Sequence, residues 1–224
     1  MADQFNADNL GSFLRPQYLL DAHWRKAPPE ELRALEDRAI VDVLTMQESV
    51  GMPIVTDGEF RRELFFSTVV AVANGYDPYG YERFHRDEEG HELHFGTPTP
   101  VATLTRKASQ VDVEFAFTRR HTARPIKVTM PSPSMMRRYW KDGVSDRAYA
   151  SKDAYMDDLI AIEHEDALAL AAAGAAYVQI DAPHFAMMHE TAPRQMLAHL
   201  DDAMREMAAL DNRVLDGVEG VVTA

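Results

Sequence analysis

The chain has 224 residues, and its 23 Lys and Arg against 36 Asp and Glu give a formal net charge of −13 at pH 7. This acidic balance argues against a nucleic-acid or anionic-membrane partner, because both require a positively charged surface. Cysteine is absent, which excludes disulfide scaffolds, thiolate catalysis and zinc sites with Cys ligands from this chain. With no signal-peptide core and no apolar run near the ~20 residues of a membrane helix, we expect a globular, cytoplasmic protein.

In the first third of the chain, short apolar runs flank a long helical pattern. A first strand is expected near Phe5 to Leu10. Apolar residues at 3.6-residue spacing predict a helix over Glu30 to Val50, which Pro28-Pro29 opens and Gly51 follows. Pro53 to Thr56 is typical of a short buried strand. This order of strand, helix and strand indicates an α/β fold.

Residues 75–122 break this alternation. The stretch is rich in Gly, Pro, His and charged residues, and it then shows β-like segments at Val101 to Leu104 and Val111 to Phe117. We therefore predict a β-hairpin-like insertion after the second βα unit. Because no linker divides the chain, the insertion belongs to a single domain of residues 1–224.

The alternation resumes after the insertion. Ile126 to Met130 is expected to be a strand, and Lys152 to Ala173 a long helix with Ser151 as N-cap and Gly174 as C-cap. Tyr177 to Ile180 is the clearest strand. The last expected elements are a helix from Thr191 to Met207 and the start of a strand at Val221 to Thr223.

Strands that alternate with helices of ten or more residues predict parallel pairing with right-handed crossovers. A complete TIM (β/α)₈ barrel takes about 250 residues. Because the insertion occupies part of this chain, we expect only the first four to five βα units of such a barrel.

Polar residues follow three of the predicted strands, as Gly11-Ser12-Phe13, Asp57-Gly58-Glu59 and Asp181-Ala182-Pro183. Ligands of parallel α/β folds bind at the carboxyl ends of the strands, where these loops converge. Asp57 is equally well explained as a turn residue. Glu59 is harder to explain by the turn alone. Because Asp181 follows an apolar strand, the Asp181 carboxylate should lie at a buried rim and need a partner.

Other side chains have both a functional and a structural interpretation. Arg15, close to Ser12, is a candidate clamp for an anionic substrate group, and Arg61-Arg62 is either another clamp or a surface ion pair. Trp140 would either stack on a flat ring or fill the mouth of a barrel. The sequence contains no phosphate loop, nucleotide fingerprint or Ser-His-Asp signature.

Four ordered motifs resemble the catalytic domain of cobalamin-independent methionine synthase, above all its short single-barrel relatives. They are Gly11-Ser12-Phe13-Leu14-Arg15-Pro16, Asp57-Gly58-Glu59-Phe60-Arg61, Lys127-Val128-Thr129-Met130-Pro131-Ser132-Pro133 and Tyr177-Val178-Gln179-Ile180-Asp181-Ala182-Pro183. The similarity runs from about Gly11 to the end of the chain. It implies a (β/α)₈ barrel that uses zinc to transfer a methyl group from methyltetrahydrofolate to the thiol of homocysteine, in methionine biosynthesis.

The resemblance also implies roles for individual residues. Ser12 would bind the carboxylate of the amino-acid acceptor, homocysteine or methionine, while Glu59 and Asp181 would bind its ammonium group. Trp140 and the segment Pro131 to Ser134 would lie toward the folate.

The zinc ligands of that family, a His-x-Cys pair, a Glu and a second Cys, lie on the fifth strand and beyond. This sequence reaches only the start of that strand and has no Cys. We therefore expect an N-terminal, acceptor-binding part of the barrel that holds no tetrahedral zinc and transfers no methyl group by itself. Its open sheet edge would favour self-association, or pairing with a second chain that completes the barrel.

Two alternatives stay open on the sequence alone. Glu59 and Asp181 would serve as the acid pair of a glycoside hydrolase on a TIM-like barrel, a reaction that needs neither metal nor cysteine. The chain would otherwise be a non-catalytic half-barrel that binds an amino acid or a partner.

Overall fold

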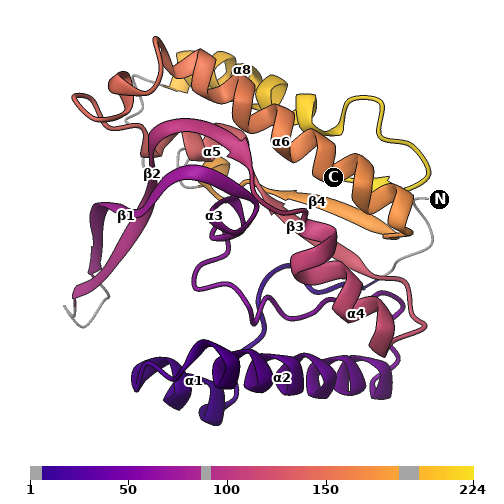
Figure 1. Ribbon diagram of the computed structural model, residues 1–224. Coiled ribbons are helices and arrows are strands. Elements are labelled where there is room, and N and C mark those ends of the chain that lie inside the picture. Colours follow the sequence, from indigo (N-terminus) through magenta and orange to yellow (C-terminus); the bar gives the residue numbers. More distant parts are fainter. Residues whose placement is uncertain (1–6, 87–91, 187–196) are drawn as a thin grey trace.

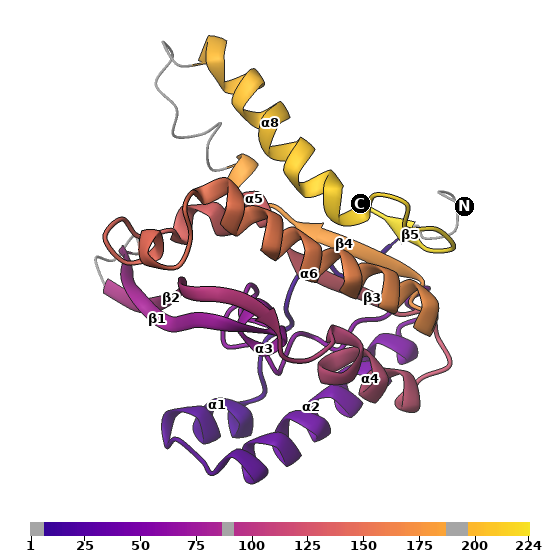
Figure 2. The same cartoon turned by 45° about the horizontal axis from the view of Figure 1, so that its top comes forward.

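The computed structural model describes residues 7–86, 92–186 and 197–224. Its elements in chain order are α1 Gln17–Trp24, α2 Pro29–Ser49, α3 Thr68–Val72, β1 Ala73–Arg86, β2 Glu92–Arg106, η1 Val111–Phe115, α4 Ala116–His121, β3 Lys127–Pro131, α5 Pro133–Met136, η2 Arg137–Tyr139, η3 Ser145–Arg147, α6 Lys152–Ala173, β4 Tyr177–Asp181, α8 Leu197–Leu215 and β5 Val222–Thr223. In both ribbon views, α6 and α8 lie on one side of the β3–β4–β5 sheet, and α1, α2 and α4 lie toward the opposite end of the molecule (Figures 1 and 2).

A parallel sheet in the order β3-β4-β5 forms the centre of the fold. All five residues of β3 are buried, as expected for a parallel strand that is covered on both faces. At the other side of β3, Val55 forms a single parallel bridge with Ile126. The strand expected over Pro53 to Thr56 is therefore reduced to one bridge, although its place beside β3 is the one that parallel pairing requires.

The long helices confirm the predictions made from periodicity and capping. α2 differs from the expected range by one residue at each end, and α6 has the expected bounds. The Ser151 hydroxyl accepts a hydrogen bond from the Ala154 N–H (3.1 Å), and Gly174 adopts the left-handed conformation (φ 90°) that ends many helices. The start of the last helix, expected at Thr191, lies outside the described residues. Its end is Leu215 rather than Met207.

The expected hairpin is present, because β1 and β2 pair antiparallel with two irregularities in register. The expected segment Val101 to Leu104 lies in β2. Val111 to Phe117, by contrast, is helical in η1 and α4, so the β interpretation of that segment is wrong. Residues 110, 114 and 118 share one helical face and are all buried, so this face carries polar side chains into the interior.

The first expected strand is not formed over residues 7–10, and residues 5 and 6 lie outside the described range. The segment nevertheless lies along the sheet. The Lys127 ammonium donates to Asp8 Oδ2 (2.6 Å), and the Gln179 amide donates to the Leu10 carbonyl (3.2 Å). Side chains from β3 and β4 therefore hold this segment along the sheet, with Asp8 beside the first residue of β3 and Leu10 beside the middle of β4.

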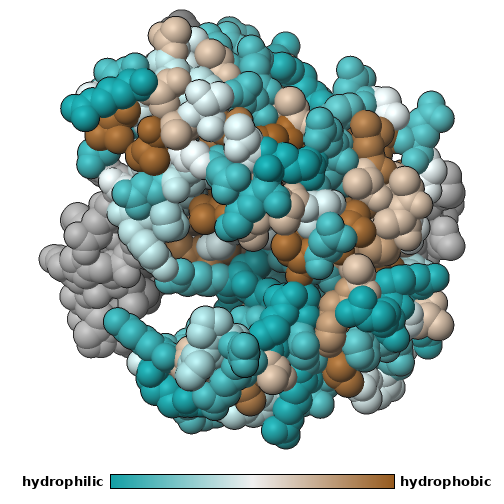
Figure 3. All heavy atoms as spheres, in the orientation of Figure 1, coloured by the Kyte–Doolittle hydropathy of each residue, from teal (hydrophilic) through white to brown (hydrophobic). Residues whose placement is uncertain are grey.

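Hydrophilic and hydrophobic side chains are unevenly distributed on the surface. On the face in Figure 3, hydrophilic side chains predominate over α1 and α2, and hydrophobic ones are exposed at several places in the middle and upper part of the molecule. Among the helices of the described ranges, none combines the length and apolarity that a membrane span requires.

Candidate functional site

A cleft of about 640 Å³ lies against one face of β4 and continues past its carboxyl end. Tyr177, Gln179 and Asp181, at alternate positions of β4, all line it, as the period-two geometry of a strand requires. The remaining lining residues are Leu10, Gly11, Ser12, Glu59, Phe65, Ile180, Ala182, Pro183 and Ala224. The three predicted residues Ser12, Glu59 and Asp181 thus come from three separate segments of the chain to one cleft.

Glu59 is held in an uncommon backbone conformation. Its φ is +58° and follows a φ of +74° at Gly58, so two consecutive residues adopt the left-handed region. The Glu59 N–H donates to Asp57 Oδ1 (2.9 Å), which ties the turn to its own first residue. A buried, non-glycine residue in this region costs free energy, and such residues cluster at functional sites. The turn aims the Glu59 carboxylate toward β3, where Thr129 Oγ1 donates to it (3.0 Å).

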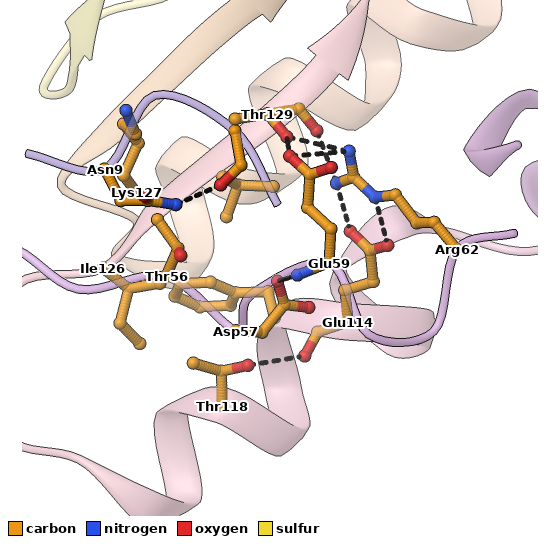
Figure 4. A pocket seen from close by; sticks show the side chains of 13 residues that line it. Asn9, Thr56, Asp57, Glu59, Arg62, Glu114, Thr118, Ile126, Lys127 and Thr129 are labelled. Carbon is orange, nitrogen blue, oxygen red and sulfur yellow. Dashed lines mark hydrogen bonds and ion pairs between the residues drawn. The ribbon is translucent and has the colours of Figure 1, made fainter. Parts of the chain in front are cut away.

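Arg62 is the cation of this site, and it is buried (3% exposed). Its Nε and Nη2 donate to the two carboxylate oxygens of Glu114, each at 2.8 Å, and Nη1 and Nη2 donate to Thr129 Oγ1 and to the Thr129 carbonyl, also at 2.8 Å (Figure 4). Its Nη1 lies 3.6 Å from Glu59 Oε1. The interpretation of Arg62 as a substrate clamp or a surface ion pair is therefore wrong. Its donors are used within the interior, where a fork-shaped bidentate pair is the favourable geometry.

Several carboxylates and cations gather around the turn, since Arg15 acts on Glu59, Arg61 on Glu114 and Lys127 on Asp181, in addition to Arg62. Arg62 faces the carboxylates of Asp57, Glu59 and Glu114, and burial raises the pKa of Asp57 to about 6, with Glu114 adding to the shift. Burial also raises the pKa of Asp181, and the Glu59 charge contributes to this. No Lys, Arg or His side chain is among the described residues that line the cleft. The site therefore favours a cationic group in its ligand.

Arg15 and Trp140 do not line the cleft. The Arg15 guanidinium donates to the carbonyls of Glu59 (3.3 Å) and Arg62, so it braces the turn from behind. The Trp140 indole N–H donates to Asp142 Oδ1 (2.9 Å), and its ring centroid lies 6.3 Å from that of Tyr155. Arg15 therefore supports the turn that carries Glu59, and Trp140 packs beside Tyr155.

Several residues near the site were not predicted from the sequence. Gln110 donates from its amide to Glu114 Oε2 (3.0 Å) and to the Thr129 carbonyl (2.8 Å), and the fully buried Lys127 donates to Gln179 Oε1 (2.9 Å). The spacing of these residues in the sequence could have indicated both groups. Gln110 and Glu114 have the four-residue spacing of one helix face, and Gln179 is two residues before Asp181, on the same face of a strand.

The described residues do not fit the zinc that the resemblance implies. The chain has no Cys, and in residues 7–86, 92–186 and 197–224 no group of three or more His, Asp or Glu has the arrangement of a metal site. Structural and catalytic zinc sites need three or four such ligands around one point.

Comparisons with known proteins agree with the motifs, although no family model matches the chain. YxjH of Bacillus subtilis (strain 168), described as uncharacterized, is 26% identical over 208 residues, which are 88% of this chain and 52% of that protein. A methionine synthase of Sulfurisphaera tokodaii is 26% identical over 179 residues, 78% of this chain and 50% of the relative. The chain thus spans about half the length of these curated relatives.

Solved structures are similar too. A B12-independent methionine synthase from Shewanella sp. W3-18-1, in complex with selenomethionine, has a TM-score of 0.66 and 26% identity, covering 88% of this chain and 52% of that one. A candidate vitamin-B12-independent methionine synthase from Listeria monocytogenes has a TM-score of 0.70 at 21% identity, covering 98% and 64%, and shows the likeness of fold. The α/β fold and the resemblance to cobalamin-independent methionine synthases are confirmed.

Removing one partner of the buried pair should destabilise the protein strongly. We expect Glu114→Ala to lower the free energy of unfolding by about 3–5 kcal/mol, because the Arg62 charge is left buried without its bidentate partner. Urea unfolding followed by circular dichroism measures this. The control is Glu165→Ala, which removes an exposed partner of Arg106 and should cost less than about 1 kcal/mol. Equal losses in the two variants would contradict the assignment.

The buried Asp57 predicts a pH dependence of stability. Its pKa in the folded protein, about 6, is above the ordinary 3.8, so folding favours the protonated form. This contribution is fully present below pH 3.8 and is lost as the pH rises through 6. We expect Asp57→Asn, which keeps the acceptor for the Glu59 N–H, to be more stable than the wild type by about 3 kcal/mol at pH 7. The difference should fall by about 1 kcal/mol between pH 8 and pH 5. A difference in urea unfolding that does not vary with pH would refute this.

Proposed function

We propose that this chain binds the amino-acid substrate of a methyl transfer to a thiol, in the manner of a cobalamin-independent methionine synthase, and thereby takes part in methionine biosynthesis in the cytoplasm. One observation carries the proposal: two carboxylates, Glu59 and Asp181, reach a single cleft from different strand ends, and no basic side chain of the described residues lines it. The similarity to methionine synthases supports the same substrate class.

Each part of the cleft has a complement in homocysteine or methionine. The Glu59 and Asp181 carboxylates would bind the ammonium group through charge-assisted hydrogen bonds. The Ser12 hydroxyl, which is exposed in the cleft, would donate to the substrate carboxylate. Leu10, Phe65 and Ile180 supply apolar surface for the sulfur-containing side chain. In this proposal the chain contributes to catalysis by fixing the acceptor, which is the main task of an enzyme that joins two substrates.

For the methyl donor and the metal, the proposal relies on the family resemblance alone. By resemblance the donor is methyltetrahydrofolate, with Trp140 on the side toward the pterin, and zinc supplies activation of the acceptor thiol. Because the described residues do not fit zinc, we assign no methyl-transfer step to them. Arg15 has a positioning role in this proposal, since it holds the backbone of the turn that carries Glu59.

The glycoside hydrolase alternative gains no support from the comparisons. The reported relatives with a described activity are methionine synthases. An acid pair in one cleft is compatible with both reactions, so a measurement of which ligand binds distinguishes them.

Binding of L-methionine, measured by isothermal titration calorimetry at pH 8, tests the proposal. We expect Glu59→Gln and Asp181→Asn each to weaken binding by about 10- to 100-fold, the effect of losing one hydrogen bond to a charged group. Binding should also weaken on acidification, and at a higher pH than for an ordinary Asp, because burial raises the pKa of Asp181.

Two controls make this experiment specific. Glu165→Gln alters an exposed carboxylate and should bind as the wild type does. The desamino analogue 4-(methylthio)butanoate lacks the ammonium group and should not bind. If the analogue binds as tightly as methionine, or if both acid variants keep full affinity, the proposed role of the two carboxylates is wrong.

A further inference from the structure

A second buried polar cluster lies where the loops after β3 and β4 meet α8. It consists of Ser132, Ser134, His184 and Asp211, which are 0%, 2%, 1% and 7% exposed, and we call it the Asp211 cluster. The Asp211 carboxylate lies within 2.9 Å of both serine hydroxyls and accepts from the Ser134 N–H (2.8 Å). None of these four side chains lines the cleft, so the proposed substrate binding does not account for them.

Counting protons identifies the donor between the histidine and the serine. Ser134 Oγ lies 2.9 Å from Asp211 Oδ2 and 2.9 Å from His184 Nε2, yet a hydroxyl has only one proton. A carboxylate only accepts, so the hydroxyl donates to Asp211 and its oxygen accepts from His184 Nε2. The His184 Nδ1 is buried and has no hydrogen-bond partner among the described residues, which favours a neutral ring with its proton on Nε2.

The Asp211 cluster is joined to the cleft through two short connections. His184 follows directly after Asp181, Ala182 and Pro183, all of which line the cleft. The Ser132 N–H donates to the Asp181 carbonyl (3.1 Å). The main chain at Asp181 is therefore fixed on one side by Ser132 and, three residues later, by the bond of His184 to Ser134.

We propose that His184 is a positioning residue for the cleft, and that a second proton on its ring releases the loop after β4. The imidazolium would carry its new proton on Nδ1, for which the described residues supply no acceptor, so the ring would have to move toward water. The loop with Asp181 would move with it. This role of His184 rests on the proposed function only where it concerns substrate binding.

The charged groups around the ring set the direction of the effect. Burial lowers the pKa of His184, Arg138 of η2 lowers it further, and Asp211 of α8 opposes them. On α6, Glu163 faces Asp211, and burial with the nearby Asp211 raises the pKa of Glu163 well above its ordinary value. Since folding favours neutral His184, the cluster is intact at neutral and higher pH and is weakened as the pH falls.

Substitutions at His184 test the two parts separately. Gln keeps an amide N–H for the Ser134 oxygen but does not titrate, and Phe keeps the ring volume without a donor. At pH 8 we expect His184→Phe to weaken methionine binding by about three- to tenfold, the effect of one neutral hydrogen bond, and His184→Gln to recover most of that loss. Between pH 8 and pH 5.5 the wild type should lose affinity at least threefold more than His184→Gln. The matched control, His121→Gln on α4, replaces an exposed histidine and should follow the wild type.

A ligand-free readout separates this proposal from the proposed function. In nuclear magnetic resonance spectra without methionine, the Ala182 amide should shift with the same midpoint as the His184 ring in the wild type, and should not shift in His184→Gln. This result would support the proposal even if methionine failed to bind, which would refute only the proposed function. An Ala182 amide that ignores His184, or identical pH profiles of binding in the wild type and His184→Gln, would overturn it.

Discussion

The site depends on burying one guanidinium among three carboxylates. Arg62 pairs with Glu114 through two hydrogen bonds and contacts Glu59, and the same side chain bonds to Thr129 of β3. Without this cation, the buried Glu114 carboxylate would lose its bidentate partner, and an uncompensated charge in the interior costs several kcal/mol. The buried Arg62 charge therefore connects three parts of the fold. They are the turn at residues 57–59, the helical segment that carries Glu114, and strand β3.

The chemistry of the cleft follows from which charged side chains line it. Glu59 and Asp181 line the cleft, whereas the nearby cations Arg15, Arg62 and Lys127 do not. The two acids lie beside apolar walls and a serine hydroxyl, which suits a small molecule with an ammonium group, a carboxylate and an apolar side chain. The strained turn at Glu59 is consistent with this use, since its backbone cost is offset by the bonds to Asp57 and Thr129.

Patterns among neighbouring residues predicted much of the secondary structure. Contacts between residues far apart in the sequence could not be predicted in this way. The range of α6 follows from its caps at Ser151 and Gly174, and the cleft acids follow from their places at strand ends. The helix at residues 111–117 was missed because Val, Val and Phe at alternate positions resemble a strand. In the folded protein its Glu114 pairs with an arginine 52 residues earlier. No local pattern shows such a contact, and the same is true of Lys127 and Asp211.

The most direct test of the central claim is a crystal structure of this chain with L-selenomethionine, in which anomalous scattering locates the selenium. The account predicts one selenium site in the cleft beside β4, with the ligand nitrogen within hydrogen-bonding distance of the Glu59 and Asp181 carboxylates. Selenium outside the cleft, or a ligand whose carboxylate rather than its nitrogen faces these two acids, would contradict it.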